Sequence, residues 1–213
     1  MSKQKPLTYL FVLLSILNAL GIIFPEVIDK KLVTFLPFPV LILLYLFSVK
    51  KVNILYFISL LATFCGIVLF NTASYFEPSL IFYAIGVCLY VVIVLKTAVV
   101  ISMRSILMTT IPFLIVYLVP LFYYYDSVQT DIFNYIMFYV FFVGLFFFVS
   151  GLVYVNQRNT KNLWLLNSGI VFLISTVIHG YYIFSEKLVS IRVAIVFTFL
   201  FMHYAMYRYI ITK

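Results

Sequence analysis

Seven polar or charged side chains interrupt the long apolar runs of this 213-residue chain, and each could bind a ligand or take part in proton transfer. These residues are Asn18, Asn71, Lys96, Asn134, Asn167, His179 and His203. None of the six acidic residues lies inside an apolar run. Hydrolysis by acid–base catalysis usually requires a carboxylate, or a histidine that a carboxylate orients. The residue types therefore favour a binding role and leave catalysis an open question.

The two histidines are the strongest candidates for a site. His179 follows Thr176 by three residues, which places both side chains on one face of a helix. For each histidine we expect either a hydrogen bond between helices or a functional role, as a base or in contact with a lipid headgroup. His179 and His203 lie in separate apolar runs without further ligand residues beside them, so we expect no metal and no cofactor.

Other residues allow a structural interpretation beside a functional one. Lys96 lies near the end of its run, so its side chain can extend to the membrane surface; the alternative is a contact with a lipid or phosphate group in a cavity. Cys65 and Cys88 lie inside apolar runs and are expected to be buried hydrophobic residues. Tyr207 and Tyr209 end the last run and are expected to anchor the chain at the level of the lipid headgroups.

Transmembrane helices must position these residues. Hydrophobic residues make up 66% of the chain and charged residues only 9%, against about 25% in an ordinary soluble domain. A helix needs about 20 apolar residues to cross the hydrocarbon core. The apolar runs predict an all-α fold, a polytopic bundle of about eight helices that forms a single transmembrane domain over residues 1–213. The predicted spans are 7–24, 32–49, 54–71, 80–102, 106–124, 132–155, 163–184 and 188–211.

The charged residues predict how this bundle is oriented. With the N-terminus inside, ten of the fourteen basic residues fall on inner segments: Lys3, Lys5, Lys50, Lys51, Lys96, Arg104, Arg158, Lys161, Arg208 and Lys213. All six acids fall outside: Glu26, Asp29, Glu77, Asp126, Asp131 and Glu186. The positive-inside rule then places both termini in the cytoplasm, and the short loops favour a bacterial inner (plasma) membrane. The basic residues are scattered rather than clustered, so no nucleic-acid partner is expected.

Several strings of residues resemble the YhhN-like family of membrane proteins, which includes the lysoplasmalogenases. They are residues 65–69, Phe76 with the later Gly86 and Tyr90, residues 169–176 and residues 199–203. The resemblance covers roughly residues 35 to 211 and implies eight transmembrane helices. It also implies a catalytic pair of Asp residues that cleaves a vinyl-ether bond.

This chain departs from that family at the residues that would carry the chemistry. Ile67 and Thr176 stand where the family has its two Asp residues, and His203 stands in place of a family Gln. Protonating an enol ether needs an acid, and activating water needs a base, so Ile67 can supply neither. Asn71 lies four residues beyond Ile67 and His179 three beyond Thr176, which leaves a relocated polar site as the route to catalysis.

Three functional hypotheses follow. The first is a non-catalytic protein on a YhhN-like scaffold, which binds membrane lipids or is an accessory subunit with other membrane-protein subunits as partners. The second is a diverged lysoplasmalogenase-type hydrolase, with His179, Thr176, Asn71 and His203 as weak catalytic candidates. The third is a small-solute transporter, suggested by a short repeat between residues 66–70 and 169–173 and by prolines in the fifth span. The absence of carboxylates from the spans favours the first.

Overall fold

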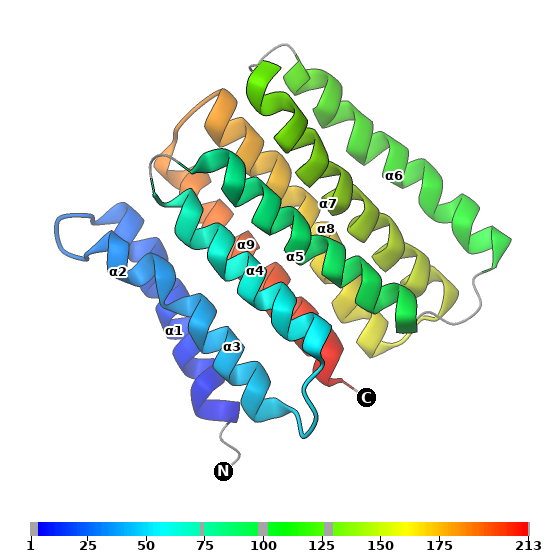
Figure 1. Cartoon of the computed structure of the whole chain (residues 1–213), viewed down its shortest axis with the longest axis horizontal. Helices are drawn as coiled ribbons and strands as arrows, with labels where there is room; N and C mark the ends of the chain where they lie inside the picture. Colours follow the sequence, from blue (N-terminus) through cyan, green and yellow to red (C-terminus); the bar gives the residue numbers. More distant parts are fainter. Residues whose placement is uncertain (1–3, 73–74, 98–101, 126–129, 213) are drawn as a thin grey trace.

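The fold is seen in a computed structural model, which describes residues 4–72, 75–97, 102–125 and 130–212. Within these ranges the regular secondary structure is entirely helical, which confirms the all-α prediction (Figure 1). The described helices are α1 (Gln4–Ile23), α2 (Lys30–Phe35), α3 (Pro37–Ser48), α4 (Ile54–Phe70), α5 (Phe76–Thr97), α6 (Met103–Tyr124), α7 (Thr130–Asn156), α8 (Thr160–Phe184) and α9 (Val189–Ile211).

The predicted count of about eight spans is confirmed, because α2 and α3 together replace one span. The span expected over residues 32–49 divides where α2 ends at Phe35 and α3 begins at Pro37. Proline has no N–H, and its ring clashes with the carbonyl group four residues earlier, so it breaks a continuous helix. It is tolerated in the first turn of α3, where N–H groups have no partner within the helix. Elsewhere the ends shift by a few residues, as for α5, which begins at Phe76 instead of Leu80.

Five helices are long and apolar enough to cross a membrane: α1, α5, α7, α8 and α9. Three apolar segments are shorter and correspond to α3 with the end of α2, to α4, and to most of α6. A bundle of such helices leaves large apolar side chains on its outer surface, among them Leu43, Leu107, Ile115 and Phe138, which are all exposed. Lipid can solvate that surface whereas water cannot. The chain is therefore an integral membrane protein.

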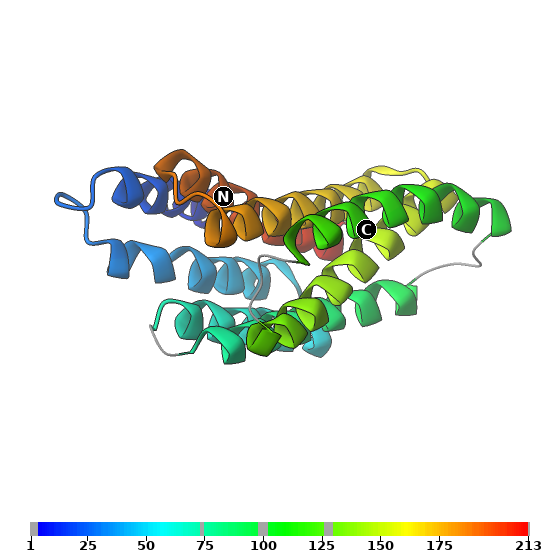
Figure 2. The ribbon, with the colours of Figure 1, turned by 90° about the horizontal axis from the view of Figure 1, so that it is seen from above.

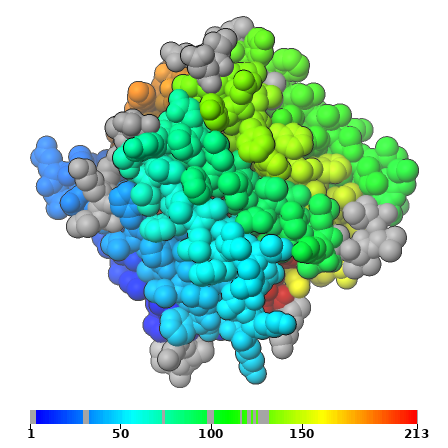
Figure 3. Space-filling model, in the orientation of Figure 1, coloured from blue at the N-terminus to red at the C-terminus, as the bar shows by residue number. Residues whose placement is uncertain are grey.

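The long helices pack in two layers. Helices α4 and α5 pair with each other in front of the pair α8 and α9, and α7 contacts both α5 and α8 (Figures 1 and 2). Helix α1 lies against α3 and α9, whereas α6 lies at the edge, with α7 as its main neighbour. Side chains of α3, α4, α5 and α7 form a continuous surface on the face shown in Figure 3.

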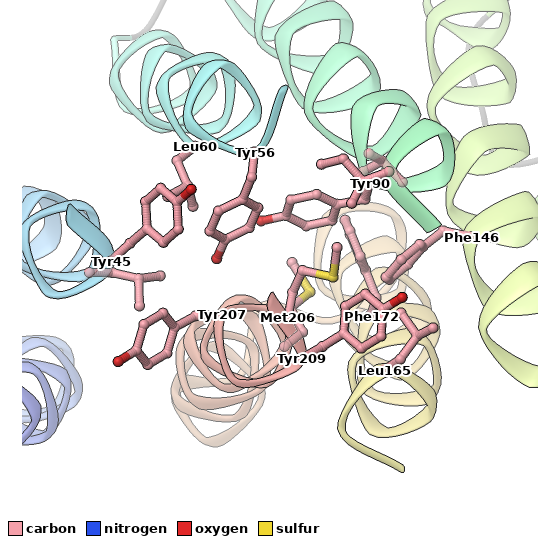
Figure 4. Close-up of a cluster of buried hydrophobic side chains, with 14 of the residues drawn as sticks. Tyr45, Tyr56, Leu60, Tyr90, Phe146, Leu165, Phe172, Met206, Tyr207 and Tyr209 are labelled. Carbon is pink, nitrogen blue, oxygen red and sulfur yellow. The ribbon is translucent and has the colours of Figure 1, made fainter. Parts of the chain in front are cut away.

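Aromatic side chains fill the centre of the bundle. Tyr45, Tyr56 and Tyr90 come from α3, α4 and α5 and point toward one another, and Phe146 and Met206 face them from α7 and α9 (Figure 4). All five are at most 1% exposed. Close packing of such rings supplies the van der Waals contact that holds helices together in lipid, where no hydrophobic difference drives association.

Charges separate toward the two ends of the bundle. At one end lie the start of α1 and the end of α9, together with the ends of α3, α5 and α7 and the starts of α4, α6 and α8 (Figure 1). This basic end has eight of the described basic residues: Lys5, Lys50, Lys51, Lys96, Arg104, Arg158, Lys161 and Arg208. The opposite, acidic end has every described acid, Glu26, Asp29, Glu77, Asp131 and Glu186, together with Lys30, Lys31, Lys187 and Arg192. Lys3, Lys213 and Asp126 lie outside the described residues.

Candidate functional site

A cavity of about 260 Å³ lies between the helices in the half of the bundle nearest the acidic end. Residues of all nine described helices line it, most of them from α4, α5, α7, α8 and α9, and it extends to Asn71 and Arg192 near the acidic surface. Its walls are mainly apolar and aromatic. Ligand pockets in proteins have volumes of about 300–1,000 Å³ and similarly apolar walls, so this cavity is close to the lower end of that range.

The cavity brings together three residues that the sequence singled out. Asn71 at the end of α4 and Thr176 and His179 on α8 all line it. Asn18 of α1 lines it as well. Ile67 of α4 also lies in the wall.

His179 is held in the wall by packing rather than by hydrogen bonds. Its ring meets that of Phe70 edge to face, with 5.2 Å between the ring centres. Neither ring nitrogen has a hydrogen-bond partner among the described residues, and the side chain lines the cavity. In the part of the chain that the structure describes, no carboxylate orients the imidazole as in a hydrolytic triad. His179 can therefore donate to or accept from a ligand, but the protein does not fix its tautomer.

Thr176 lies on the same face of α8 as His179 and has its own partners. Its hydroxyl donates to the carbonyl of Phe172 at 3.0 Å and lies 3.4 Å from the hydroxyl of Tyr139 on α7. These contacts engage Thr176 within the protein, so it is less available to a ligand than His179.

His203 lies beneath the floor of the cavity and does not line it. The side chain is 1% exposed, and its Nδ1 atom is 2.8 Å from the hydroxyl of Tyr90. The rings of Phe38 and Phe199, which line the cavity, pack against the imidazole at centre distances of 5.0 and 4.8 Å. The contact with Tyr90 joins α9 to α5, which is the structural role that the sequence allowed for a buried histidine.

The remaining polar candidates lie away from the cavity. Lys96 is exposed in the last turn of α5 at the basic end, where it can extend to the membrane surface. Asn134 is exposed on α7, and Asn167 is half-buried on α8. Of the two cysteines, Cys65 is exposed and Cys88 half-buried, so neither is the fully buried residue that was expected.

Two residues of the cavity were missed in the sequence. Tyr83 of α5 packs its ring against Gly66, where a Cβ atom would come within 2.9 Å of the ring. Arg192 lies in the first turn of α9. Both line the cavity, and neither has a hydrogen-bond or ion-pair partner among the described residues. Arg192 lies inside the predicted span 188–211, and a charge within an apolar span was the available signal for it.

The chemistry of the lining favours binding. No Asp or Glu is among the described residues that line the cavity, so a carboxylic acid that could protonate a substrate is missing from these walls. The described residues also contain no group of three or more metal-ligating side chains. The cavity instead combines an apolar interior with a few unpaired donors, which suits an amphiphilic molecule.

Comparisons with known proteins add no relative from which a role could be transferred. No family model, no curated protein and no solved structure matches this chain. The inferences about its function therefore depend on its own residues and on the geometry of the cavity.

Proposed function

We propose that this membrane protein is a non-catalytic lipid-binding protein, or the lipid-binding accessory subunit of a membrane complex, on a YhhN-like scaffold. It takes the apolar chain of a membrane lipid into the cavity near the acidic end. By the positive-inside rule this end faces away from the cytoplasm, so the lipid would come from the outer leaflet of the inner (plasma) membrane. The observation that carries the proposal is an apolar cavity with unpaired polar groups and no acid among the described lining residues.

The apolar walls alone do not explain selective binding. A lipid chain in a bilayer is already in an apolar environment, so moving it into the cavity gains little from the hydrophobic effect. Affinity must come instead from close packing and from the polar groups. The size of the cavity, about 260 Å³, favours one chain over the two chains of an ordinary phospholipid.

Three unpaired polar groups supply the selectivity. The hydroxyl of Tyr83, the imidazole of His179 and the guanidinium of Arg192 all line the cavity without partners among the described residues. Polar groups without partners at membrane depth cost free energy, and a ligand with acceptor oxygens removes that cost. A single-chain amphiphile whose polar head lies near Arg192 and His179 satisfies this requirement.

The scaffold part of the proposal has separate support. Ile67 and Thr176 occupy the two positions that the resemblance matches to the family Asp pair, and both line the same cavity. A catalytic pair must share one site, so this arrangement is what the resemblance requires of the two positions.

Native mass spectrometry of gently purified protein tests the binding proposal. We expect one defined lipid to be retained by the wild-type protein and lost in Arg192→Gln and in His179→Leu. Lys187→Gln is the matched control, because Lys187 is an exposed cation at the same end that does not line the cavity. A bound polypeptide would identify an accessory subunit. Folded wild-type protein without lipid, or equal retention in all variants, would reject lipid binding in the cavity.

A hydrolase remains the second candidate, because Asn71, Thr176 and His179 share the cavity. It predicts release of an aldehyde from lysoplasmalogen by the wild-type protein and loss of that activity in His179→Ala. A gain-of-function test is sharper: Ile67→Asp combined with Thr176→Asp restores both family acids to the cavity wall. If only the double variant releases aldehyde, the result supports the proposal of a non-catalytic protein on a YhhN-like scaffold. If the wild-type protein releases aldehyde, the result supports the hydrolase.

A further inference from the structure

A cluster of aromatic rings and an arginine lies at the basic end, away from the cavity. The guanidinium of Arg208, in the last turn of α9, lies over the ring of Trp164 on α8, with 4.8 Å between its central carbon and the ring centre. Tyr204 packs edge to face on Trp164 at 6.4 Å and stacks on Phe11 of α1 at 5.7 Å. Three helices thus fix the position of Arg208.

Most hydrogen-bond donors of Arg208 have no acceptor. Its Nη1 atom lies 3.4 Å from the hydroxyl of Tyr204, a long contact for a hydrogen bond. Its Nε atom is buried without a partner, and Nη2 has none among the described residues. Nε and Nη2 form one edge of the guanidinium, the edge that binds two oxygens of a phosphate side by side. A small turn of the side chain toward a phosphate at the surface would give Nε an acceptor.

The charges around the cluster are all of one sign. Lys161, in the first turn of α8, lies 5.6 Å above the ring centre of Tyr209. The described residues of the basic end include eight cations and no carboxylate, so no acidic side chain competes for Arg208. An excess of cations favours a ligand with net negative charge over a zwitterion.

We propose that this cluster, Trp164, Tyr204 and Arg208 with Lys161 beside them, binds the phosphodiester headgroup of an anionic phospholipid in the leaflet at the basic end. The arginine takes the phosphate oxygens, the aromatic rings hold the arginine in place, and Lys161 adds charge at the same level. The site lies at the opposite end of the bundle from the cavity, and this proposal does not depend on the function proposed for the cavity.

The chain offers a direct reporter of this site, because Trp164 is its one tryptophan. The full-length protein is reconstituted in phosphatidylcholine nanodiscs with increasing fractions of phosphatidylglycerol, and tryptophan emission is recorded. We expect a saturable change in emission with phosphatidylglycerol, absent in pure phosphatidylcholine and weakened by salt. In Arg208→Gln the apparent affinity for phosphatidylglycerol should fall about five- to tenfold. The affinity of Arg208→Lys should be intermediate, because lysine keeps the positive charge but cannot bind two phosphate oxygens side by side.

Arg104→Gln is the matched control, since Arg104 is an exposed cation of the same end on the peripheral helix α6. The control should respond like the wild-type protein. An equal loss in Arg104→Gln would mean that a diffuse surface potential attracts the lipid, and it would overturn the site. The same emission in both lipids would also overturn it. Counting retained phosphatidylglycerol by native mass spectrometry, with a helical circular dichroism spectrum for each variant, keeps the test valid if Arg208→Gln alters the fluorescence itself.

Discussion

The two halves of the bundle differ in how their tyrosines and lining residues are paired. In the half near the basic end three tyrosines have close partners: Tyr207 with Ser48 at 2.7 Å, Tyr209 with Thr97 at 2.7 Å, and Tyr45 with the backbone N–H of Asn53 at 2.7 Å. The buried Tyr56 hydroxyl and the Nε atom of Arg208 are exceptions in this half. In the half near the acidic end, Tyr83, His179 and Arg192 line a cavity without partners among the described residues.

The difference separates groups that hold the fold from groups that are available to a ligand. A tyrosine bonded to a neighbouring helix restricts how two helices can move, and the space around it is filled. An unpaired polar group beside an open cavity contributes little to the fold and depends on a ligand for its hydrogen bonds. The four predictions below test this contrast, in order of decreasing effect on the free energy of unfolding.

The largest effect is expected for Tyr90→Ala. Tyr90 is 1% exposed among Tyr56, Phe146 and His203, so truncation leaves a void and should lower the free energy of unfolding by about 3–5 kcal/mol. Tyr83→Ala is the matched variant two turns earlier on α5, beside the existing cavity, and should cost less than half as much. Thermal unfolding in one detergent measures both. Equal losses would contradict the contrast between the two halves.

A smaller loss is expected for His203→Leu. It removes the hydrogen bond between His203 and the Tyr90 hydroxyl, which should cost about 0.5–1.5 kcal/mol, because Ser59 also interacts with that hydroxyl. His203→Asn keeps an amide near the position of Nδ1, so it can keep the contact with Tyr90 and should destabilise the protein less than Leu does. If Asn destabilises as much as Leu, packing rather than the hydrogen bond is what His203 contributes.

The pair Ser48 and Tyr207 should show a weak coupling. In membrane proteins, hydrogen bonds between helices contribute about 0.6 kcal/mol on average, and this value is expected from a double-mutant cycle of Ser48→Ala and Tyr207→Phe. Because both single variants and the double variant are measured, the cycle separates the hydrogen bond from changes in packing. A coupling energy of zero would show that the hydrogen bond between Ser48 and Tyr207 does not stabilise the basic half of the bundle.

The smallest change in stability is expected for His179→Leu. His179 has no hydrogen bond to lose among the described residues, so the free energy of unfolding of lipid-free protein should change less than in His203→Leu. Lipid retention should nevertheless fall, which separates binding from folding. A loss as large as that of His203→Leu would show that His179 is a structural residue.

The helical spans were predictable because their signal is local. Each apolar run is long enough to identify a span without knowledge of its neighbours, and the charges at its ends fix its direction. The break between α2 and α3 is also local, at Pro37, but prolines are tolerated both in the first turn of a helix and inside transmembrane helices, so the sequence did not distinguish a new helix from a continuous one.

The site was predictable only in part, because pairing between distant helices leaves no local signal. Asn71 and His179 stood out as polar residues in apolar runs, and both line the cavity. Because tyrosines commonly anchor helices at the level of the lipid headgroups, the sequence offered no reason to expect that a particular tyrosine joins two helices. Tyr207 and Tyr209 are both only 3% exposed and join helices, so the expectation that they anchor the chain at the level of the lipid headgroups was wrong. Tyr83 was not among the residues that the sequence singled out.

Unequal helix lengths impose a demand on the surrounding bilayer. Helix α4 has 17 residues, about 26 Å at 1.5 Å per residue, whereas α7 has 27 residues, about 40 Å. A hydrocarbon core of about 30 Å cannot match both, so the long helix must tilt or the bilayer must thin beside the short one. Since α4 ends next to Asn71 at the cavity, thinning on that side would draw lipid headgroups toward the cavity. The thickness of the bilayer would then influence how readily a ligand enters.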